Sequence, residues 1–487
     1  MTDILLVTFN ARYSHTAFGL RYLLANLGEL QERARLVEFS LEHSPSEALE
    51  VIWQEQPRIV GISVYIWNAT LVTSLARLIK QVMPQVWVVM GGPEISWQST
   101  DHPANEWADY IIPGEGEVAF ARLCRQLLAG QPPGSRLLPP ELPHLTTLKL
   151  PYDLYSDEDI RHREIYVESN RGCPYRCTFC LSALDHKVRR FNAADFLMAM
   201  ETLLQRGVRR FKFVDRSFNL DGHRSEDILA FFLERQNLGF YLHLEFAPEK
   251  ISPAMKSLLA AFQPGCLQLE VGVQSMDPAV RQAIQRPGDI QKVEENIRWL
   301  ATHTHAHLHA DLIVGLPGEG IHGFAKGFNR LLATGVHEIQ VGILKRLSGM
   351  PMAREEGIGE FNPDPPYTLL CNDLLDFSKV RRLERFARYW DRIANSGHFP
   401  HTRSLLGEFW TFLAYSDWLF ERIHSTHGIA LERLHGLLLE GLPEIGLEPA
   451  QVGEALESDR RHRERIQKKK LATPKRQQQH QQEGTPG

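Results

Sequence analysis

The feature that most constrains this 487-residue chain is a cluster of three cysteines, Cys173, Cys177 and Cys180, in the run Arg-Gly-Cys-Pro-Tyr-Arg-Cys-Thr-Phe-Cys. Thiols this close in sequence are poorly placed for ordinary disulfides, but they can surround a compact soft metal centre. A structural zinc site normally closes with a fourth cysteine or histidine, and the nearest downstream candidates here are His186 and Cys266. Three thiolates on a four-iron cluster would leave one iron open, as a catalytic centre requires.

The spacing Cys-x3-Cys-x2-Cys, with the aromatic Phe179 before the last cysteine, resembles the signature of the radical S-adenosylmethionine (SAM) superfamily. The resemblance implies that Cys173, Cys177 and Cys180 bind a 4Fe-4S cluster whose open iron binds the amino and carboxylate groups of SAM. It also implies an external electron donor of the flavodoxin or ferredoxin type, and cleavage of SAM to a 5′-deoxyadenosyl radical. The alternative interpretation is a zinc knuckle or three incidental cysteines.

Composition narrows the class of protein further. The net charge of −5 gives no argument for binding to nucleic acid or to a membrane surface. The first residues lack a basic segment followed by a long apolar stretch, so we expect no signal peptide. No apolar run approaches the ~20 residues that a membrane span needs. Six cysteines, three of them clustered, favour a reducing compartment over a disulfide scaffold, and the sequence predicts a cytoplasmic protein.

Residues 1–130 alternate short apolar runs with amphipathic helical patterns, which predicts an α/β domain built on a doubly wound parallel sheet. The expected strands are Ile4–Thr8, Ala34–Phe39, Ile59–Val64, Val86–Met90 and Tyr110–Ile112. Sheets of this kind bind ligands at the carboxyl ends of their strands. The candidate binding residues at those ends are Asn10, Ser63, Gly91, Gly92, Glu94 and Gly114.

The order of these loops, ahead of a radical SAM motif, resembles the cobalamin-binding domain of one large radical SAM class, and this resemblance implies a cobalamin cofactor. Domains of that type that ligate cobalt through histidine carry Asp-x-His-x-x-Gly after the first strand. Here the run from Asn10 through His15 to Gly19 lacks the aspartate, and its glycine is one residue too far along. We therefore expect that His15 is not an axial ligand.

Residues 131–163 contain six prolines, which predicts an extended linker. Strand and helix patterns resume over residues 164–352 and resemble the partial (β/α)6 barrel of radical SAM cores. The six expected strands are Glu164–Glu168, Arg210–Val214, Tyr241–Glu245, Cys266–Gly272, Leu308–Val314 and Glu338–Leu344. In barrels of this type the chemistry lies at the carboxyl ends of the strands, and the cysteine motif follows the first of these strands.

The ends of the later strands carry polar residues and glycines where the resemblance implies contacts with SAM. Asp215 and Asn219 resemble the segment that faces the SAM amino group, and Glu245 could accept from ribose hydroxyls. The further candidates, on the nucleoside and adenine side, are Glu270, Gln274, Ser275 and Gly315. A structural alternative exists for each, since a carboxylate at a strand end often caps a helix; Glu319, for example, could favour a helix N-terminus.

Two further features have competing interpretations. His303, His305, His307 and His309 alternate with a period of two, which would place them on one side of an extended chain as a metal strip. We instead interpret them as a helix exit followed by a partly exposed strand.

Residues 363–466 have helical patterns and resemble the all-helical domain of unknown function that follows the core in some cobalamin-type radical SAM proteins. The final residues, 467–487, are rich in lysine and glutamine, which predicts a disordered tail. A basic tail could contact RNA, but a solvated tail is the interpretation we favour.

The combined hypothesis is a radical SAM enzyme that modifies an unactivated carbon of a small-molecule substrate, by cobalamin-dependent methyl transfer. One alternative is a tRNA-modifying enzyme that resembles the methylthiotransferases. Those relatives usually carry a second cysteine triad in their N-terminal domain, whereas residues 1–130 contain only Cys124. The other alternative is a non-catalytic cobalamin or metal carrier or sensor.

Overall fold

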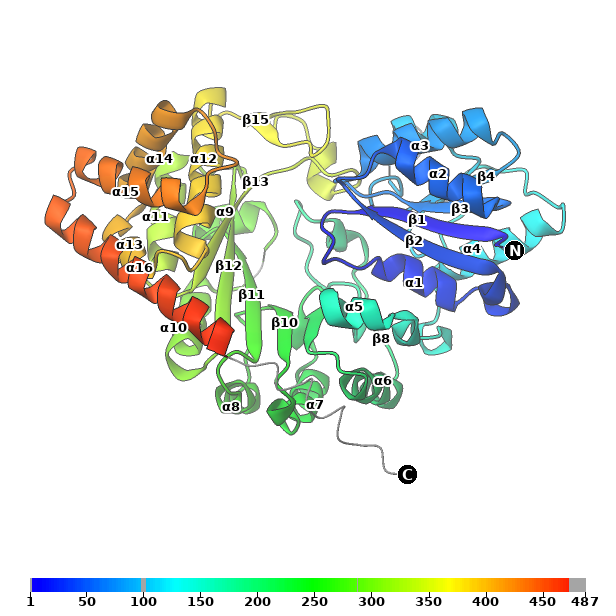
Figure 1. Ribbon diagram of the computed structural model, residues 1–487, viewed down its shortest axis with the longest axis horizontal. Helices are drawn as coiled ribbons and strands as arrows, with labels where there is room; N and C mark the ends of the chain where they lie inside the picture. Colours follow the sequence, from blue (N-terminus) through cyan, green and yellow to red (C-terminus); the bar gives the residue numbers. More distant parts are fainter. Residues whose placement is uncertain (1, 98–101, 287, 473–487) are drawn as a thin grey trace.

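The computed structural model describes residues 2–97, 102–286 and 288–472. The N-terminal part is a five-stranded parallel sheet in the order β2-β1-β3-β4-β5, with helices on both faces (Figure 1). Its strands are β1 (Ile4–Asn10), β2 (Ala34–Ser40), β3 (Ile59–Ser63), β4 (Trp87–Gly91) and β5 (Tyr110–Ile112). All five lie where the sequence predicts them, so the doubly wound fold is confirmed.

The strands of this sheet are apolar because both of its faces are buried, each in its own hydrophobic core. Helices α2 (Pro45–Glu55) and α3 (Ala69–Val82) cover one face. Helices α1 (Phe18–Ala25) and α4 (Glu117–Leu128) cover the other. Every residue of β1 is buried as a result, which is why this strand is a nearly continuous apolar run.

The prediction of an extended linker over residues 131–163 is wrong in one detail, because this segment contains a short helix, α5 (Asp157–His162). Ser156 and Asp159 form a capping box that starts this helix in an otherwise extended segment. Asp159 also accepts from Arg21 of α1 at 2.9 Å, and Arg21 pairs with Glu38 at 2.8 Å. The segment is therefore fastened to the N-terminal sheet.

The second sheet has six strands in the order β13-β12-β11-β10-β9-β6, all parallel. Its strands are β6 (Ile165–Val167), β9 (Arg210–Phe213), β10 (Tyr241–Phe246), β11 (Leu267–Gln274), β12 (His307–Val314) and β13 (Glu338–Ile343). The helices between them are α6 (Ala193–Gln205), α7 (Gly222–Leu233), α8 (Pro253–Ala261), α9 (Pro278–Ala283), α10 (Ile290–His303) and α11 (Ile321–Leu332). The predicted partial (β/α)6 barrel is confirmed.

A two-stranded ribbon, β7 (Asn170–Arg171) with β8 (Arg189–Arg190), flanks the cysteine loop.

The strands of the barrel have two different faces. Along β10, β11 and β12 fully buried residues alternate with partly exposed ones. The buried set is apolar and packs under the outer helices, while the partly exposed set of these three strands is mostly polar and lines the inner face. The inner face can therefore hold polar ligands at its carboxyl end.

The C-terminal region begins with a small antiparallel ribbon rather than with a helix, which corrects the prediction. β14 (Glu360–Phe361) pairs with β15 (Leu369–Cys371), and the predicted helix from Leu369 begins only at Phe377, where the side chain of Asp376 caps it. The helices are α12 (Phe377–Trp390), α13 (Pro400–Leu406), α14 (Phe409–Ile423), α15 (Leu431–Glu444) and α16 (Pro449–Ala472), with a π-helical turn over Asp391–Asn395. Residues 467–472 of the predicted disordered tail belong to α16, and residues 473–487 lie outside the described residues.

The C-terminal helices share one core with the barrel. Phe328 of α11 lies 4.8 Å from Trp390 and 5.8 Å from Phe409, measured between ring centroids. One continuous cluster of buried side chains extends from the barrel strands to α16. The region 363–466 therefore packs as an extension of the barrel (Figure 1).

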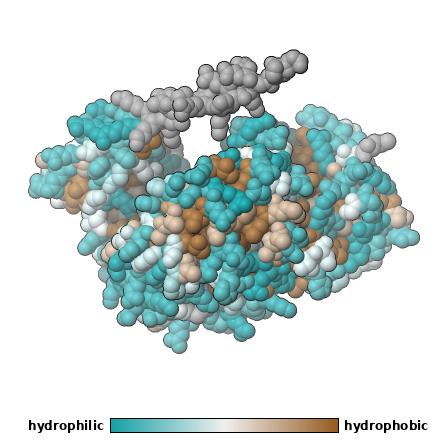
Figure 2. Space-filling view, turned by 90° about the horizontal axis from the view of Figure 1, so that it is seen from below, coloured by the Kyte–Doolittle hydropathy of each residue, from teal (hydrophilic) through white to brown (hydrophobic). Residues whose placement is uncertain are grey.

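The surface of the molecule is mostly polar. The face seen from below in Figure 2 is largely hydrophilic, with hydrophobic patches toward its middle. Among the described residues, no helix combines the length and the apolar character that a membrane crossing would require.

Gly315, predicted as an adenine contact, has a packing role that can be tested. Its φ is +92°, and an added Cβ would lie 2.2 Å from Cδ2 of Leu369. Gly318, with φ +82°, has open space around the same position. Gly315→Ala should lower the free energy of unfolding by about 2–5 kcal/mol, since it adds a clash to backbone strain.

Gly318→Ala is the matched control, because it adds backbone strain alone and should cost about 1–2 kcal/mol. Chemical denaturation of both variants gives the comparison. Equal losses in the two variants would contradict the packing role.

Candidate functional site

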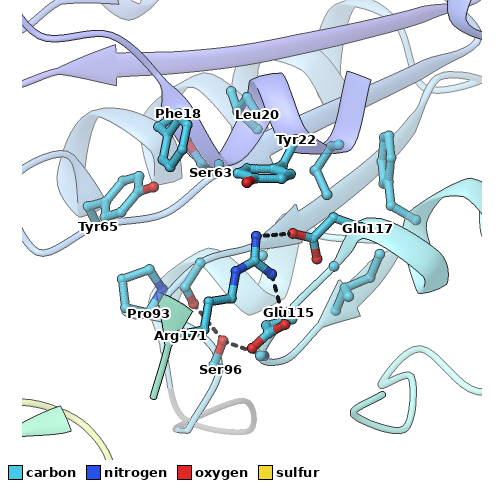
Figure 3. Close-up of a pocket in the computed structure, with 18 of the residues that line it drawn as sticks. Phe18, Leu20, Tyr22, Ser63, Tyr65, Pro93, Ser96, Glu115, Glu117 and Arg171 are labelled. Carbon is cyan, nitrogen blue, oxygen red and sulfur yellow. Dashed lines mark hydrogen bonds and ion pairs between the residues drawn. The ribbon is translucent and has the colours of Figure 1, made fainter. Parts of the chain in front are cut away.

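A large cavity lies between the N-terminal sheet and the barrel, and we call it the interface cavity. It has a volume of about 500 Å³, which is within the usual range of small-molecule sites. Phe18 and Tyr22 of α1 and Tyr65 after β3 supply aromatic walls (Figure 3). The cavity thus lies at the carboxyl ends of the sheet, where the topology of a doubly wound fold places ligands.

Four of the six predicted N-terminal residues line the interface cavity: Ser63, Gly91, Gly92 and Gly114. Gly92 has a φ of +110°, and an added Cβ would lie 2.6 Å from the carbonyl oxygen of Val64, so the turn itself requires this glycine. Ser96 fixes the same loop by donating to the Gly92 carbonyl at 2.7 Å.

The other two predicted residues do not line the cavity. Asn10 donates to Glu38 at 3.0 Å, and Glu94 accepts from Tyr367 at 2.6 Å. His15 also lies outside the cavity, against Tyr166, with 6.2 Å between the ring centroids. Among the described residues, no histidine lines this cavity.

A buried ion cluster closes one wall of the interface cavity. Arg171, two residues before Cys173, pairs with Glu115 at 2.8 Å, Glu117 at 2.7 Å and Glu168 at 2.8 Å (Figure 3). Burial alone would raise the pKa of Glu115, but Arg189 and Arg171 hold that pKa below its ordinary value. The cluster joins the loop after β5 to the start of the cysteine loop.

The three cysteines line a second, smaller space, which we call the cysteine pocket, with a volume of about 130 Å³. Cys173 and Cys177 are buried and Cys180 is partly exposed. The end of α9 holds the cysteine loop in place, since Thr178 donates its backbone N–H to the Ile284 carbonyl at 3.0 Å. Phe179, between the last two cysteines, also lines the pocket.

Three of the residues predicted to contact SAM line the cysteine pocket together with the cysteines. Glu245 ends β10, and Glu270 and Gln274 lie on β11; all three line the cysteine pocket. Gln274 has a φ of +70° at an irregularity in the pairing of β11 with β12. A non-glycine residue in this conformation is typical of functional sites.

Three other candidates lie outside the cysteine pocket and belong to the scaffold. Asp215 is fully buried and accepts hydrogen bonds from Ser169 and Asn170. Ser275 donates to Glu319 at 2.6 Å, beneath the start of α11. Gly315 packs against Leu369, as described above.

Asn219, a further candidate from the sequence, also lies outside the pocket. It ties two loops together through the backbone of Ala247 and Lys250.

The carboxylates of the cysteine pocket have contrasting environments. Burial raises the pKa of Glu245 to about 7. Burial would also raise the pKa of Glu270, but His243, at 2.7 Å, holds it below its ordinary value. Near neutral pH, Glu245 is thus poised to exchange a proton while Glu270 is ionised.

Sequence reasoning missed two arginines in this region. Arg286, after α9, donates to the sulfur of Cys177 at 3.7 Å. Arg216 follows β9, and its guanidinium makes no hydrogen bond or ion pair with the described part of the chain, although its carbonyl accepts from Ser217 at 2.6 Å. The alternation along β9 is a signal for Arg216, since Phe211 and Phe213 face the outer helices and every second residue faces inward.

The interface cavity and the cysteine pocket adjoin. Ser182 and Arg216 line both of them. A ligand at the cysteines and a ligand on the N-terminal sheet can therefore approach the same point.

The geometry agrees with the interpretation of the alternating histidines as a helix exit followed by a partly exposed strand. His307 pairs with Glu338 at 2.6 Å, and His309 lies 3.4 Å from Asp311. Among the described residues, no group of three or more histidine, cysteine or carboxylate side chains is arranged to hold one metal ion. The three thiols line one pocket.

Two protein-family models match the chain, the B12 binding domain over residues 4–124 and the radical SAM superfamily over residues 167–331. The chain is 28% identical to the cobalamin-dependent radical SAM methyltransferase TokK of Streptomyces tokunonensis, over 63% of this chain and 49% of TokK. It is more distantly similar to the ribosomal protein uS12 methylthiotransferase RimO of Thermus thermophilus, at 26% identity over 42% of this chain and 48% of RimO. The chain thus spans about half the length of these curated relatives.

The fold is shared with the radical S-adenosylmethionine methyltransferase TsrM of Kitasatospora setae, which was solved with tryptophan substrate and a SAM analog. The TM-score is 0.62, with 86% of this chain and 99% of the TsrM chain covered. At 16% sequence identity, this likeness establishes the architecture.

The raised pKa of Glu245 leads to a prediction about how the free energy of unfolding depends on pH. A carboxyl with a folded pKa above its unfolded value of 4.5 binds more protons when folded, so its contribution to stability falls as the pH rises from about 4.5 through about 7. Glu245→Gln removes this dependence. Relative to the unsubstituted protein, the variant should gain about 2 kcal/mol of unfolding free energy between pH 5 and pH 8.

Chemical denaturation at the two pH values measures the difference. An exposed carboxylate, Glu234→Gln, is the control and should show no such gain. A pH-independent difference for Glu245→Gln would contradict the raised pKa.

Proposed function

We propose that this chain, which belongs to the radical SAM proteins with an N-terminal B12-binding domain, is a cobalamin-dependent methyltransferase that acts on an unactivated carbon. The observation that carries the proposal is the meeting of the interface cavity with the cysteine pocket at Ser182 and Arg216. Methyl transfer of this kind needs two cofactor sites that face one substrate position, and this geometry supplies them.

Cys173, Cys177 and Cys180 are the proposed ligands of a 4Fe-4S cluster. The loop that carries them is anchored at both sides, by the ion pairs of Arg171 and by the bond from Thr178 to Ile284. When bound, the cluster supplies the electron that cleaves SAM, and cobalamin supplies the methyl group. A flavodoxin- or ferredoxin-type protein is the proposed source of that electron.

Residues at the strand ends are the proposed binding groups for SAM. Glu245 and Glu270 present carboxylates and Gln274 an amide to the cysteine pocket, opposite the cysteines. Arg286 adds a guanidinium that can pair with a carboxylate. Together these side chains offer acceptors for an amino group and for hydroxyls, and a donor for an anion.

The interface cavity is the proposed site of cobalamin. Gly91, Gly92 and Gly114 let the backbone approach a large ring closely, and Phe18, Tyr22 and Tyr65 offer flat apolar contacts. The ring would be bound without a histidine from this chain, since among the described residues none lines the cavity.

A small molecule is the proposed substrate, bound where the two cavities meet. The relatives TokK and TsrM support a methyltransferase over the methylthiotransferase alternative. The N-terminal domain supports the same choice, because its single cysteine, Cys124, lies on the buried face of α4 in the core. A carrier or sensor would have no use for acidic and amide groups facing the cysteines, so an enzyme is favoured.

The cobalamin site can be tested with paired glycines. Gly114 and Gly130 have nearly equal φ values, +74° and +72°, and both have open space around an added Cβ. Only Gly114 lines the interface cavity. Gly114→Leu should therefore weaken cobalamin binding at least about tenfold, whereas Gly130→Leu, with the same backbone strain, should bind normally.

Spectroscopic titration with cobalamin under anaerobic conditions measures the affinity. His15→Ala should leave the cobalamin spectrum unchanged. Equal affinity in the two leucine variants would place the cofactor elsewhere.

The reaction type is tested with isotopic label on the SAM methyl group. Anaerobic protein with reductant, cobalamin, SAM and a metabolite extract should form 5′-deoxyadenosine and S-adenosylhomocysteine together, and label should reach one product. Replacing Cys173, Cys177 and Cys180 by alanine should abolish 5′-deoxyadenosine formation, because the cluster is lost. Substrate-dependent 5′-deoxyadenosine without labelled product would reject methyl transfer and retain the radical SAM assignment.

A further inference from the structure

A second group of charged side chains lies directly behind Cys177. It consists of Tyr175, Glu249, Arg281 and Arg286, which come from the cysteine loop, from the segment after β10 and from the end of α9. Tyr175 donates to Glu249 at 2.8 Å, and both are buried. The group is therefore sheltered from solvent, where charges interact strongly.

Arg286 is the member of this group that touches the proposed cluster ligands. Its Nη1 lies 3.7 Å from the sulfur of Cys177, and its guanidinium stands over the ring of Tyr175 at 5.4 Å. The left-handed conformation of Gln285, with φ +52°, directs the chain so that Arg286 points back toward the cysteines. Its backbone N–H donates to the carbonyl of Arg281 at 2.9 Å and fixes this turn.

Glu249 supplies the opposing charge. One of its oxygens accepts from Tyr175, while the other is buried without a hydrogen-bond partner among the described residues. Arg281 is nearby but directs its Nη1 to the carbonyl of Val273 at 2.8 Å. The field at Cys177 thus combines the positive charge of Arg286 in contact, the positive charge of Arg281 nearby and the negative charge of Glu249 behind Arg286.

We propose that Arg286 is a positioning residue that sets the reduction potential of the cluster, through its hydrogen bond and charge at Cys177, and that Glu249 moderates this effect. The inference rests on the proposed cluster at Cys173, Cys177 and Cys180. Reduction adds negative charge to a cluster and its thiolates, so a donor at a ligand sulfur stabilises the reduced form and raises the potential. Arg286 therefore makes the cluster easier to reduce by the electron donor.

The test is a redox titration of the reconstituted full-length protein, without SAM and followed by electron paramagnetic resonance. SAM is omitted so that loss of a contact to SAM cannot contribute. Arg286→Gln should lower the ratio of reduced to oxidised cluster at least tenfold at a fixed potential, which corresponds to about 59 mV for one electron. Arg286→Lys keeps the charge and should show a smaller change.

Glu249→Gln should shift the potential in the opposite direction, because it removes the negative charge and keeps an acceptor for Tyr175. Opposite signs for the two variants distinguish an electrostatic role from general damage to the pocket. Arg298→Gln, at an exposed ion pair on α10, is the control and should leave the potential unchanged. Iron and sulfide are counted for each variant before titration.

Two results would overturn the inference. One is an unchanged potential in Arg286→Gln with the cluster loaded, and the other is a shift of the same sign in Arg286→Gln and Glu249→Gln. Failure of the unsubstituted protein to assemble a four-iron cluster would instead reject the proposed function, and this inference with it.

Discussion

The ion cluster around Arg171 fixes how the two halves of the molecule meet. A buried guanidinium is costly unless it is fully paired, and Arg171 is paired with three carboxylates that come from two different parts of the chain. Glu115 and Glu117 follow the last strand of the N-terminal sheet, and Glu168 ends the first strand of the barrel. Because Cys173 lies only two residues further along, the position of the cysteine loop depends on the same pairs.

Any sliding of the N-terminal sheet relative to the barrel would leave Arg171 or one of its carboxylates buried and unpaired. Arg189 strengthens this constraint, since it reaches both Glu115 and Asp185. A hydrophobic interface could tolerate small displacements, whereas this network specifies one arrangement. The proposed cofactor on the sheet and the proposed cluster on the barrel would need such precision, because reactions between bound groups depend on ångström-scale alignment.

The sequence allowed the strands, the barrel and the grouping of the three cysteines to be predicted, because periodicity and a short spaced motif are local properties. Side-chain direction at the strand ends could not be predicted in the same way. Asp215 follows β9 as expected, but its carboxylate accepts hydrogen bonds from Ser169 and Asn170 and so belongs to the scaffold. Glu94 is likewise turned toward Tyr367, more than 270 residues away in sequence. Arg286 is a single charged residue in a turn, and only the folded chain brings it to Cys177.

The volumes of the two cavities bear on where a substrate can bind. The cysteine pocket, at about 130 Å³, is smaller than a typical small-molecule site, whereas the interface cavity, at about 500 Å³, is within that range. Ligands of both cavities must therefore share the space around Ser182 and Arg216. The guanidinium of Arg216 lies at this junction without a direct ion pair among the described residues, which favours a ligand with an anionic group there.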